Sequence, residues 1–189
     1  STDAKAQALA EDPPPRVWRV VPQATAHRAP AWVVGQIVHR ALARWSFPDT
    51  DPGMRAWALA EARTCGLTAA PLQRDAAARA SRLLTRFQSH PLYAEMMSAE
   101  LRLGEVPYTL QREDGQAETG IIDALYRREG AWSLVEFKTD SLRTPEALRR
   151  LLHEQDYVPQ VNRYLRACHA LLPADPQGNP ATVRPVLCF

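Results

Sequence analysis

Long apolar runs, paired cysteines and lysine are scarce in this sequence of 189 residues. No apolar run approaches the ~20 residues that a membrane span needs, and no basic segment followed by an apolar one opens the chain. These absences predict a cytoplasmic protein with no membrane partner. The three cysteines, Cys65, Cys168 and Cys188, are odd in number and lack C-x-x-C spacing, which argues against a disulfide framework or a zinc knuckle and favours buried thiols.

Only two of the 23 basic residues are lysine, Lys5 near the start and Lys138 inside an apolar stretch, and the other 21 are arginine. The abundance of alanine and proline beside the arginine is typical of GC-rich coding, which explains arginine in place of lysine at surface positions. It does not explain Lys138. The formal net charge of +2 and the isoelectric point of about 8.6 leave room for a nucleic-acid partner without indicating one.

The length fits one domain preceded by a short tail. Residues 1–15 are polar, rich in alanine and end in three consecutive prolines, a composition typical of a flexible tail or linker. Residues 16–189 would then form a single domain. Because the chain does not begin with Met, we expect a piece of a longer protein, although removal of Met before a small residue would give the same start.

The first half of the chain carries helical patterns. Apolar residues recur at intervals of three and four along residues 30–45, with His39 at the edge of the apolar face. A second helix is expected to open with a cap in the segment 49–52 and to end at Cys65, before Gly66. Two more helices are expected over residues 71–89 and 92–99.

From Leu101 onward, β-branched and aromatic residues replace the helical pattern. The expected strands cover residues 104–112, 119–128, 131–140 and 184–189, with a tight turn at Glu129-Gly130. One further helix is expected to begin at Thr144 and another to cover residues 157–172. This order of helices, a three-stranded meander, a helix and a returning strand predicts an α/β sandwich.

Three charged residues occupy positions where strands should be apolar. Asp123 interrupts one apolar strand, and Glu136 and Lys138 flank Phe137 in the next. Residues i and i+2 of a strand share a face, so Glu136 and Lys138 should lie together with Phe137 on the opposite face. If the turn is the two residues Glu129-Gly130, Asp123 lies directly opposite Glu136, about 5 Å away at Cβ.

Two carboxylates this close repel each other and resist burial unless a cation occupies the site. Mg²⁺ suits such a site because it takes oxygen ligands and keeps several waters for a substrate phosphate. The plainer alternative is a salt-bridged sheet face on which Lys138 merely neutralises Glu136. The pattern of these three residues, taken alone, favours the plainer alternative.

The motifs, taken in order, resemble the PD-(D/E)xK nuclease superfamily, and within it the RecB/AddA-type exonuclease domain at the C-terminus of UvrD-like bacterial helicase–nucleases. The resemblance spans about residues 33–189. It rests on G-I-I-D ending at Asp123, E-F-K at 136–138, G-Q-I-V-H ending at His39, and Q-x-x-x-Y at Gln160 and Tyr164 after Tyr157. It implies a restriction-endonuclease-like α/β core, a mixed sheet with an antiparallel meander flanked by helices, with extra N-terminal helices.

The resemblance also implies a role for each motif residue. A divalent ion, Mg²⁺ or Mn²⁺, would lie beside the scissile phosphate. Its implied ligands are His39, Asp123, Glu136 and the main-chain carbonyl of Phe137. Lys138 would orient or activate the attacking water. Gln160 and Tyr164 would position either the backbone or the strand that carries Lys138.

The implied activity is metal-dependent hydrolysis of phosphodiester bonds in single-stranded or unwound DNA, as exonuclease processing of ends in double-strand-break repair and recombination. The implied partners are DNA, helicase domains of the same polypeptide and a second helicase–nuclease subunit. Some RecB-like nucleases hold an iron–sulfur cluster through four cysteines, but three scattered cysteines predict none here. The alternative is a catalytically silent domain that binds DNA or holds a helicase partner.

Other residues receive a weaker interpretation. A cluster of arginines fits either a solvated helix face or a track for DNA phosphates, and comprises Arg143, Arg149, Arg150, Arg163 and Arg166. Trp132 and Tyr126 would either stack on bases or fill the core. Glu105 is a weak candidate for supporting the metal ligands, and Asp140 for fixing the strand exit. The histidines without an assigned role are His27, His90, His153 and His169.

Overall fold

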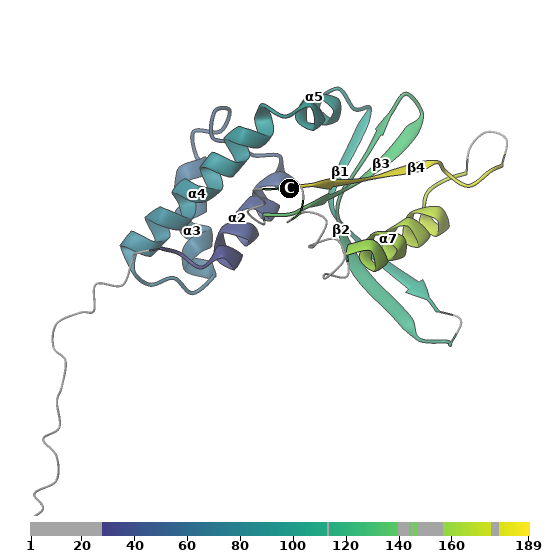
Figure 1. Ribbon diagram of the computed structural model, residues 1–189, viewed down its shortest axis with the longest axis horizontal. Coiled ribbons are helices and arrows are strands. Elements are labelled where there is room, and N and C mark those ends of the chain that lie inside the picture. The colour runs from purple at the N-terminus through teal and green to yellow at the C-terminus, as the bar shows by residue number, and fades with distance from the viewer. Residues whose placement is uncertain (1–27, 113, 140–143, 145, 147–156, 175–177) are drawn as a thin grey trace, which may run out of the picture.

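The computed structural model describes residues 28–112, 114–139, 144, 146, 157–174 and 178–189. The expected tail at 1–15 and most of the helix expected from Thr144 lie outside these residues. Helices pack on both sides of a four-stranded sheet (Figure 1). On one side lie α2 (Ala31–Arg44), α3 (Met54–Thr64) and α4 (Ala70–Gln88), and on the other lies α7 (Tyr157–Leu171). No helix in the described ranges has the length and apolar character that a membrane crossing requires.

The sheet is mixed and has the order β1-β2-β3-β4. The strands are β1 (Leu101–Gln111), β2 (Ala117–Arg128), β3 (Ala131–Phe137) and β4 (Val183–Cys188). The first three form an antiparallel meander, and β4 pairs with β3 in parallel. A parallel neighbour needs a crossover connection, and α7 (Tyr157–Leu171) lies in it. The predicted class of fold is therefore confirmed.

The helices before the sheet are α2 (Ala31–Arg44), α3 (Met54–Thr64), α4 (Ala70–Gln88) and α5 (Pro91–Met97). Each begins and ends within a few residues of its prediction except α3. The sequence predicts a cap in the segment 49–52, but α3 begins at Met54. Asp51 instead accepts the Gly53 N–H at 2.8 Å and the Ser46 hydroxyl at 2.5 Å. Its carboxylate closes the preceding loop, and the N-cap position of α3 is Gly53, which has no side chain to bond the helix.

Strand β3 separates two apolar cores. Val135 and Phe137 belong to a core shared with α2, α3, α4 and α5. Trp132 and Leu134 belong to a second core that includes Tyr164 of α7. Because alternate residues of a strand share a face, Glu136 and Lys138 follow Leu134 onto the α7 side. This confirms that Phe137 faces away from the two charged side chains.

The second core is held by an aromatic contact across the β1–β2 hairpin. The Tyr108 ring packs over Gly120, and a Cβ at Gly120 would lie 2.6 Å from that ring. The other side of the contact is Tyr164, whose ring centroid lies 5.8 Å from that of Tyr108 in an edge-to-face arrangement. The absence of a side chain at Gly120 therefore lets the hairpin pack closely against α7.

Gly120→Ala tests this packing. Because the Tyr108 ring is also held by Tyr164, it cannot move aside freely, and we expect the free energy of unfolding to fall by about 1–3 kcal/mol in urea denaturation. The same substitution should cost less in a Tyr108→Leu background, where the shorter side chain leaves room for the methyl group. Equal losses in the two backgrounds would contradict a steric cause.

Candidate active site

The candidate site lies where β3 ends, between α2 and α7. Strand β2 supplies Asp123, β3 supplies Glu136, and Lys138 directly follows β3. Lys138 remains tied to the sheet because its backbone N–H donates to the carbonyl of Cys188 at 2.7 Å. The helices supply three more side chains, which are His39 on α2 and Gln160 and Tyr164 on α7.

The hairpin register brings the two carboxylates to the same end of the sheet. Strands β2 and β3 pair from Arg128 with Ala131 to Ala124 with Val135, the register that a two-residue turn predicts. One residue further on, the Asp123 side chain accepts the backbone N–H of Phe137 at 2.8 Å. Asp123 therefore fastens the end of β3 to β2 next to Glu136.

Glu136 forms the centre of a polar network on the α7 side of the sheet. Its Oε1 accepts from Lys138 Nζ at 2.7 Å and from Gln160 Nε2 at 3.0 Å. The Gln160 amide also accepts from Lys138 Nζ at 3.2 Å and donates to the Tyr164 hydroxyl at 2.7 Å. Burial raises the pKa of Tyr164 to about 12, so this partner is a neutral phenol at physiological pH. Gln160 thus fixes the relative positions of the carboxylate and the ammonium.

One oxygen of Glu136 is buried without a partner. The residue is only 4% exposed, and its Oε2 has no hydrogen-bond partner among the described residues. Burial raises the pKa of Glu136, and the nearby Asp123 charge raises it further, against the opposite effect of Lys138. A buried carboxylate oxygen with no donor costs free energy. It is also the free oxygen ligand that a hard cation requires.

His39 reaches the site from α2. Its Nδ1 lies 3.1 Å from Asp123 Oδ1, and its side chain is 30% exposed. Burial alone would lower the pKa of His39, but the hydrogen bond and the charge of Asp123 raise it, and the net direction is upward. An imidazolium at this position stabilises Asp123, whereas a neutral imidazole would offer a nitrogen ligand.

The backbone of α2 approaches the end of β3 closely at Gly35. A Cβ at Gly35 would lie 2.9 Å from Thr139 Oγ1, and Thr139 directly follows Lys138. Gly35 is one helical turn before His39, so both lie on the same side of α2. The spacing in G-Q-I-V-H therefore has a physical reason that the sequence alone does not show. Gly35 leaves room for Thr139, the residue after Lys138, and His39 contacts the Asp123 carboxylate.

The oxygen and nitrogen donors of His39, Asp123 and Glu136 are of the kinds that bind a divalent cation, but their side chains are not arranged around a common point. Among the described residues, no three or more His, Cys, Asp or Glu side chains are grouped to hold a metal ion. In this structure His39 and Asp123 pair with each other, and Asp123 also accepts the Phe137 amide. Only Glu136 presents an oxygen that is buried and unpartnered in the described ranges of this site.

The aromatic residues considered for base stacking lie in the core. Tyr126 is 1% exposed and donates its hydroxyl to Glu95 at 2.8 Å. Trp132 of β3 is buried in the second core, with Arg127 over its ring. Glu105 is exposed and has a left-handed φ of 47° in β1, with no polar contact to the site in the described residues. These three residues therefore do not line the candidate site.

The remaining sequence candidates fall into four groups. Arg163 and Arg166 lie on α7, beside Glu118 of β2. His90 accepts the Leu92 N–H at the start of α5, a capping contact. Outside the described residues lie His27, Asp140, Arg143, Arg149, Arg150 and His153, and nothing is described of the Tyr157 side chain. Cys168 is buried and Cys65 and Cys188 are partly buried, and no disulfide joins them.

A mixed sheet flanked by helices, with an aspartate and a Glu-x-Lys element meeting at the end of an inner strand, defines a restriction-endonuclease-like protein. The family model of the PD-(D/E)XK nuclease superfamily matches residues 15–188. The chain belongs to this superfamily.

Two individual proteins add context. The chain is 29% identical over 109 residues to an ATP-dependent helicase/nuclease subunit of Heliobacterium modesticaldum, a match that covers 50% of this chain and 8% of the relative. The crystal structure of protein VC1899 from Vibrio cholerae is 12% identical, with a TM-score of 0.32 over 83% of this chain and 46% of that one. The chain therefore spans a small part of the helicase/nuclease relative.

Gly35→Ala tests the approach of α2 to the end of β3. Alanine favours the helix by about 1 kcal/mol over glycine, which offsets the displacement of the Thr139 hydroxyl, so thermal stability should be nearly unchanged. Displacement of Thr139 shifts Lys138, and we expect any nuclease turnover to fall about 10- to 100-fold.

The double variant Gly35→Ala/Thr139→Ala is the matched control for this prediction. It removes the clashing hydroxyl and should restore most of the lost turnover, measured beside melting temperature. Full activity of the single variant, or a double variant no better than the single one, would contradict the close-approach role of Gly35.

Proposed function

We propose that this chain is the nuclease domain of a helicase–nuclease and hydrolyses phosphodiester bonds of DNA with a divalent metal ion. One observation carries the proposal, the buried Glu136 carboxylate, which shares one oxygen with Lys138 and leaves the other unpartnered, among the described residues, beside Asp123. A buried oxygen with no hydrogen bond in the described residues also occurs at Glu118, but there Arg163 lies opposite it. The Glu136 oxygen differs because the second nearby charge is the carboxylate of Asp123, and paired oxygen donors are what a cation-binding site requires.

The residues that would hold Mg²⁺ or Mn²⁺ are Asp123, Glu136, His39 and the main-chain carbonyl of Phe137. When bound, such an ion lowers the pKa of a coordinated water and stabilises charge that develops on phosphoryl oxygens. Before binding, the contact with His39 Nδ1 orients the Asp123 carboxylate. Because His39 Nδ1 is engaged with Asp123, the ligand would be its other ring nitrogen, or Nδ1 once this contact is broken. Asp123 and Glu136 would therefore carry the larger share of the affinity.

Lys138 supplies a cation at a fixed point. Its Nζ is held by Glu136 Oε1 and Gln160 Oε1, and the side chain is only 14% exposed. An ammonium is a compact donor that can orient a water and exchange a proton, whereas a guanidinium is broad and stays protonated. This difference explains why a chain with 21 arginines keeps lysine at position 138. Tyr164 and Gln160 act as positioning residues for this pair.

The proposal also covers the DNA substrate, the cellular role and the partner proteins. The Heliobacterium relative, named as a helicase/nuclease, supports an origin in a protein that joins both activities, and the RecB/AddA-type motifs support exonuclease action on single-stranded DNA. We therefore assign the domain to the processing of unwound DNA ends in break repair. Its partners would be helicase domains and a second helicase–nuclease subunit. A catalytically silent DNA-binding domain is the competing function.

Cleavage of 5′-labelled linear single-stranded DNA tests the proposal. The wild-type chain should cut in Mg²⁺ or Mn²⁺ and not in EDTA, while Asp123→Ala, Lys138→Ala and Lys138→Arg should lose about a thousandfold or more, because each changes the charged groups at the reacting centre. The control is Asp49→Asn, which changes an exposed carboxylate in the segment between α2 and α3 and should retain full activity. Wild-type rates in the Asp123 and Lys138 variants would eliminate the proposed site. An inactive wild type that binds DNA would favour the silent domain.

Metal binding should also appear as stabilisation. Because the pKa of Glu136 is raised on folding, its contribution to stability is lost as the pH rises from the unfolded pKa through the folded one. Mg²⁺ relieves this penalty, so at about 100 times its Kd it should raise the melting temperature of the wild type by about 5–10 °C. The increase should be larger at pH 8 than at pH 5.

Asp123→Asn is the matched variant for this measurement. It keeps the acceptor for the Phe137 amide and removes the repulsion with Glu136, so without metal it should be at least as stable as the wild type at pH 8. It should gain little from Mg²⁺. Equal stabilisation of the wild type and the variant by Mg²⁺ would place the ion elsewhere.

A further inference from the structure

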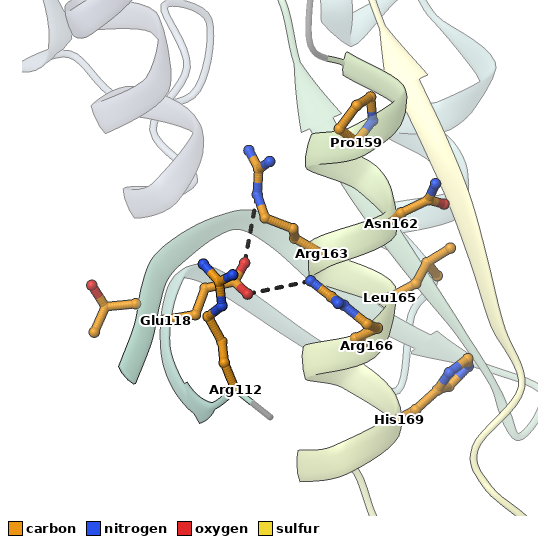
Figure 2. A pocket seen from close by; sticks show the side chains of 9 residues that line it. Arg112, Glu118, Pro159, Asn162, Arg163, Leu165, Arg166 and His169 are labelled. Atoms are coloured by element: carbon orange, nitrogen blue, oxygen red, sulfur yellow. Dashed lines mark hydrogen bonds and ion pairs between the residues drawn. The ribbon is translucent and has the colours of Figure 1, made fainter. Parts of the chain in front are cut away.

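Arginines gather at an open cleft beside the candidate site, where the end of the β1–β2 hairpin faces α7. The cleft has a volume of about 810 Å³, and Arg112, Arg163 and Arg166 line it together with a single carboxylate, Glu118. Figure 2 shows Arg163 and Arg166 reaching from α7 toward Glu118, with Arg112 on the hairpin beside it. Arg112 also pairs with Asp114, which lies outside the cleft lining, at 3.2 Å.

Glu118 is more deeply buried than the arginines it holds. Its side chain is 16% exposed, against 41% for Arg163 and 68% for Arg166. Arg166 Nη2 donates to Glu118 Oε2 at 3.2 Å, and Arg163 Nε lies 3.6 Å from Oε1. The cleft therefore presents guanidinium groups to solvent, while the carboxylate beneath them fixes their positions. Each guanidinium has five N–H donors, so one contact to Glu118 leaves donors for a second acceptor.

The cleft continues from the polar network along the same helix. Arg163 and Arg166 are three and six residues after Gln160, which the helical rise converts to about 5 and 9 Å along the α7 axis. Stacked nucleotides advance about 3.4 Å per residue of one strand, so the two arginines lie about one to three nucleotides from the Glu136–Lys138 pair. Arginine binds phosphate in a forked, charge-assisted geometry, and fixed arginines lose less entropy when they do so.

We propose that this cleft binds the phosphodiester backbone of single-stranded DNA on one side of the cleavage point, with Arg163 and Arg166 as the phosphate ligands and Glu118 as the residue that positions them. The inference rests on the proposed nuclease function for the identity of the polyanion. It adds a binding site to the reacting centre. It also predicts that the arginines act only on substrates long enough to reach them.

A binding experiment tests the cleft without catalysis. All chains carry Asp123→Asn, and the anisotropy of a labelled oligothymidylate of about twelve nucleotides is measured from low to moderate salt. Arg163→Gln/Arg166→Gln should weaken binding about tenfold and reduce the slope of log K against log salt by about 1.4, because two contacts to a single strand are lost. Arg82→Gln/Arg86→Gln removes two exposed arginines from α4 and should leave both quantities unchanged.

Without both arginines, the partly buried Glu118 carboxylate has no cation from α7 to pair with, which destabilises the fold. The melting temperature of the double variant is therefore measured to confirm that it folds. If it does not fold, Glu118→Gln/Arg163→Gln/Arg166→Gln replaces it and is compared with Glu118→Gln alone. The same loss of affinity and salt slope is expected. Affinity equal to that of the α4 control would overturn the proposal.

A cleavage experiment separates this inference from the proposed function. In the otherwise wild-type chain, the two arginine substitutions should raise KM on the oligothymidylate about tenfold and leave turnover of thymidine 5′-p-nitrophenyl phosphate, which is too short to reach them, unchanged. Equal losses of kcat/KM on both substrates would indicate a disturbed reacting centre and would overturn the proposal that the cleft binds DNA. If the wild type cleaves neither substrate, but the arginine substitutions still weaken DNA binding, the nuclease function is rejected and the binding site is kept.

Discussion

The burial of Glu136 is the constraint on which the rest of the site depends. A carboxylate that is only 4% exposed needs compensation, and the fold supplies Lys138 and Gln160 at one oxygen and leaves the other without a described partner. Asp123 adds a second negative charge instead of relieving the first. Such an arrangement costs stability, and the proposed cation would offset this cost.

The two apolar cores explain how distant segments reach the Asp123 and Glu136 carboxylates. One core fixes α2 and α4 against one face of β3, and the other fixes α7 against the opposite face. Each helix then extends a polar side chain past the end of the strand, His39 from α2 and Gln160 from α7. Because α7 also carries Arg163 and Arg166, one helix positions both the polar network around Glu136 and the cleft proposed to receive the DNA backbone.

Much of this arrangement follows from local patterns. The alternation that sets Glu136 apart from Phe137, and the two-residue turn that fixes the β2–β3 register, depend on spacing along one hairpin and were predictable. The start of α3 was not, because Asp51 bonds Ser46 and Gly53 in a loop whose path the sequence does not reveal. The contacts of Gly35 with Thr139 and of Glu118 with α7 join segments far apart in the chain, so no local pattern predicts them.

The central claim is that the unpartnered oxygen of Glu136 is a metal ligand. Anomalous scattering from crystals of the wild-type chain soaked in Mn²⁺ tests it most directly. The account predicts an ion bonded to Glu136 Oε2 and to Asp123, with Lys138 still held at Glu136 Oε1 and His39 turned from Asp123 toward the ion. Mn²⁺ bound only at other carboxylates, with Glu136 Oε2 still without a ligand at saturating concentration, would contradict it.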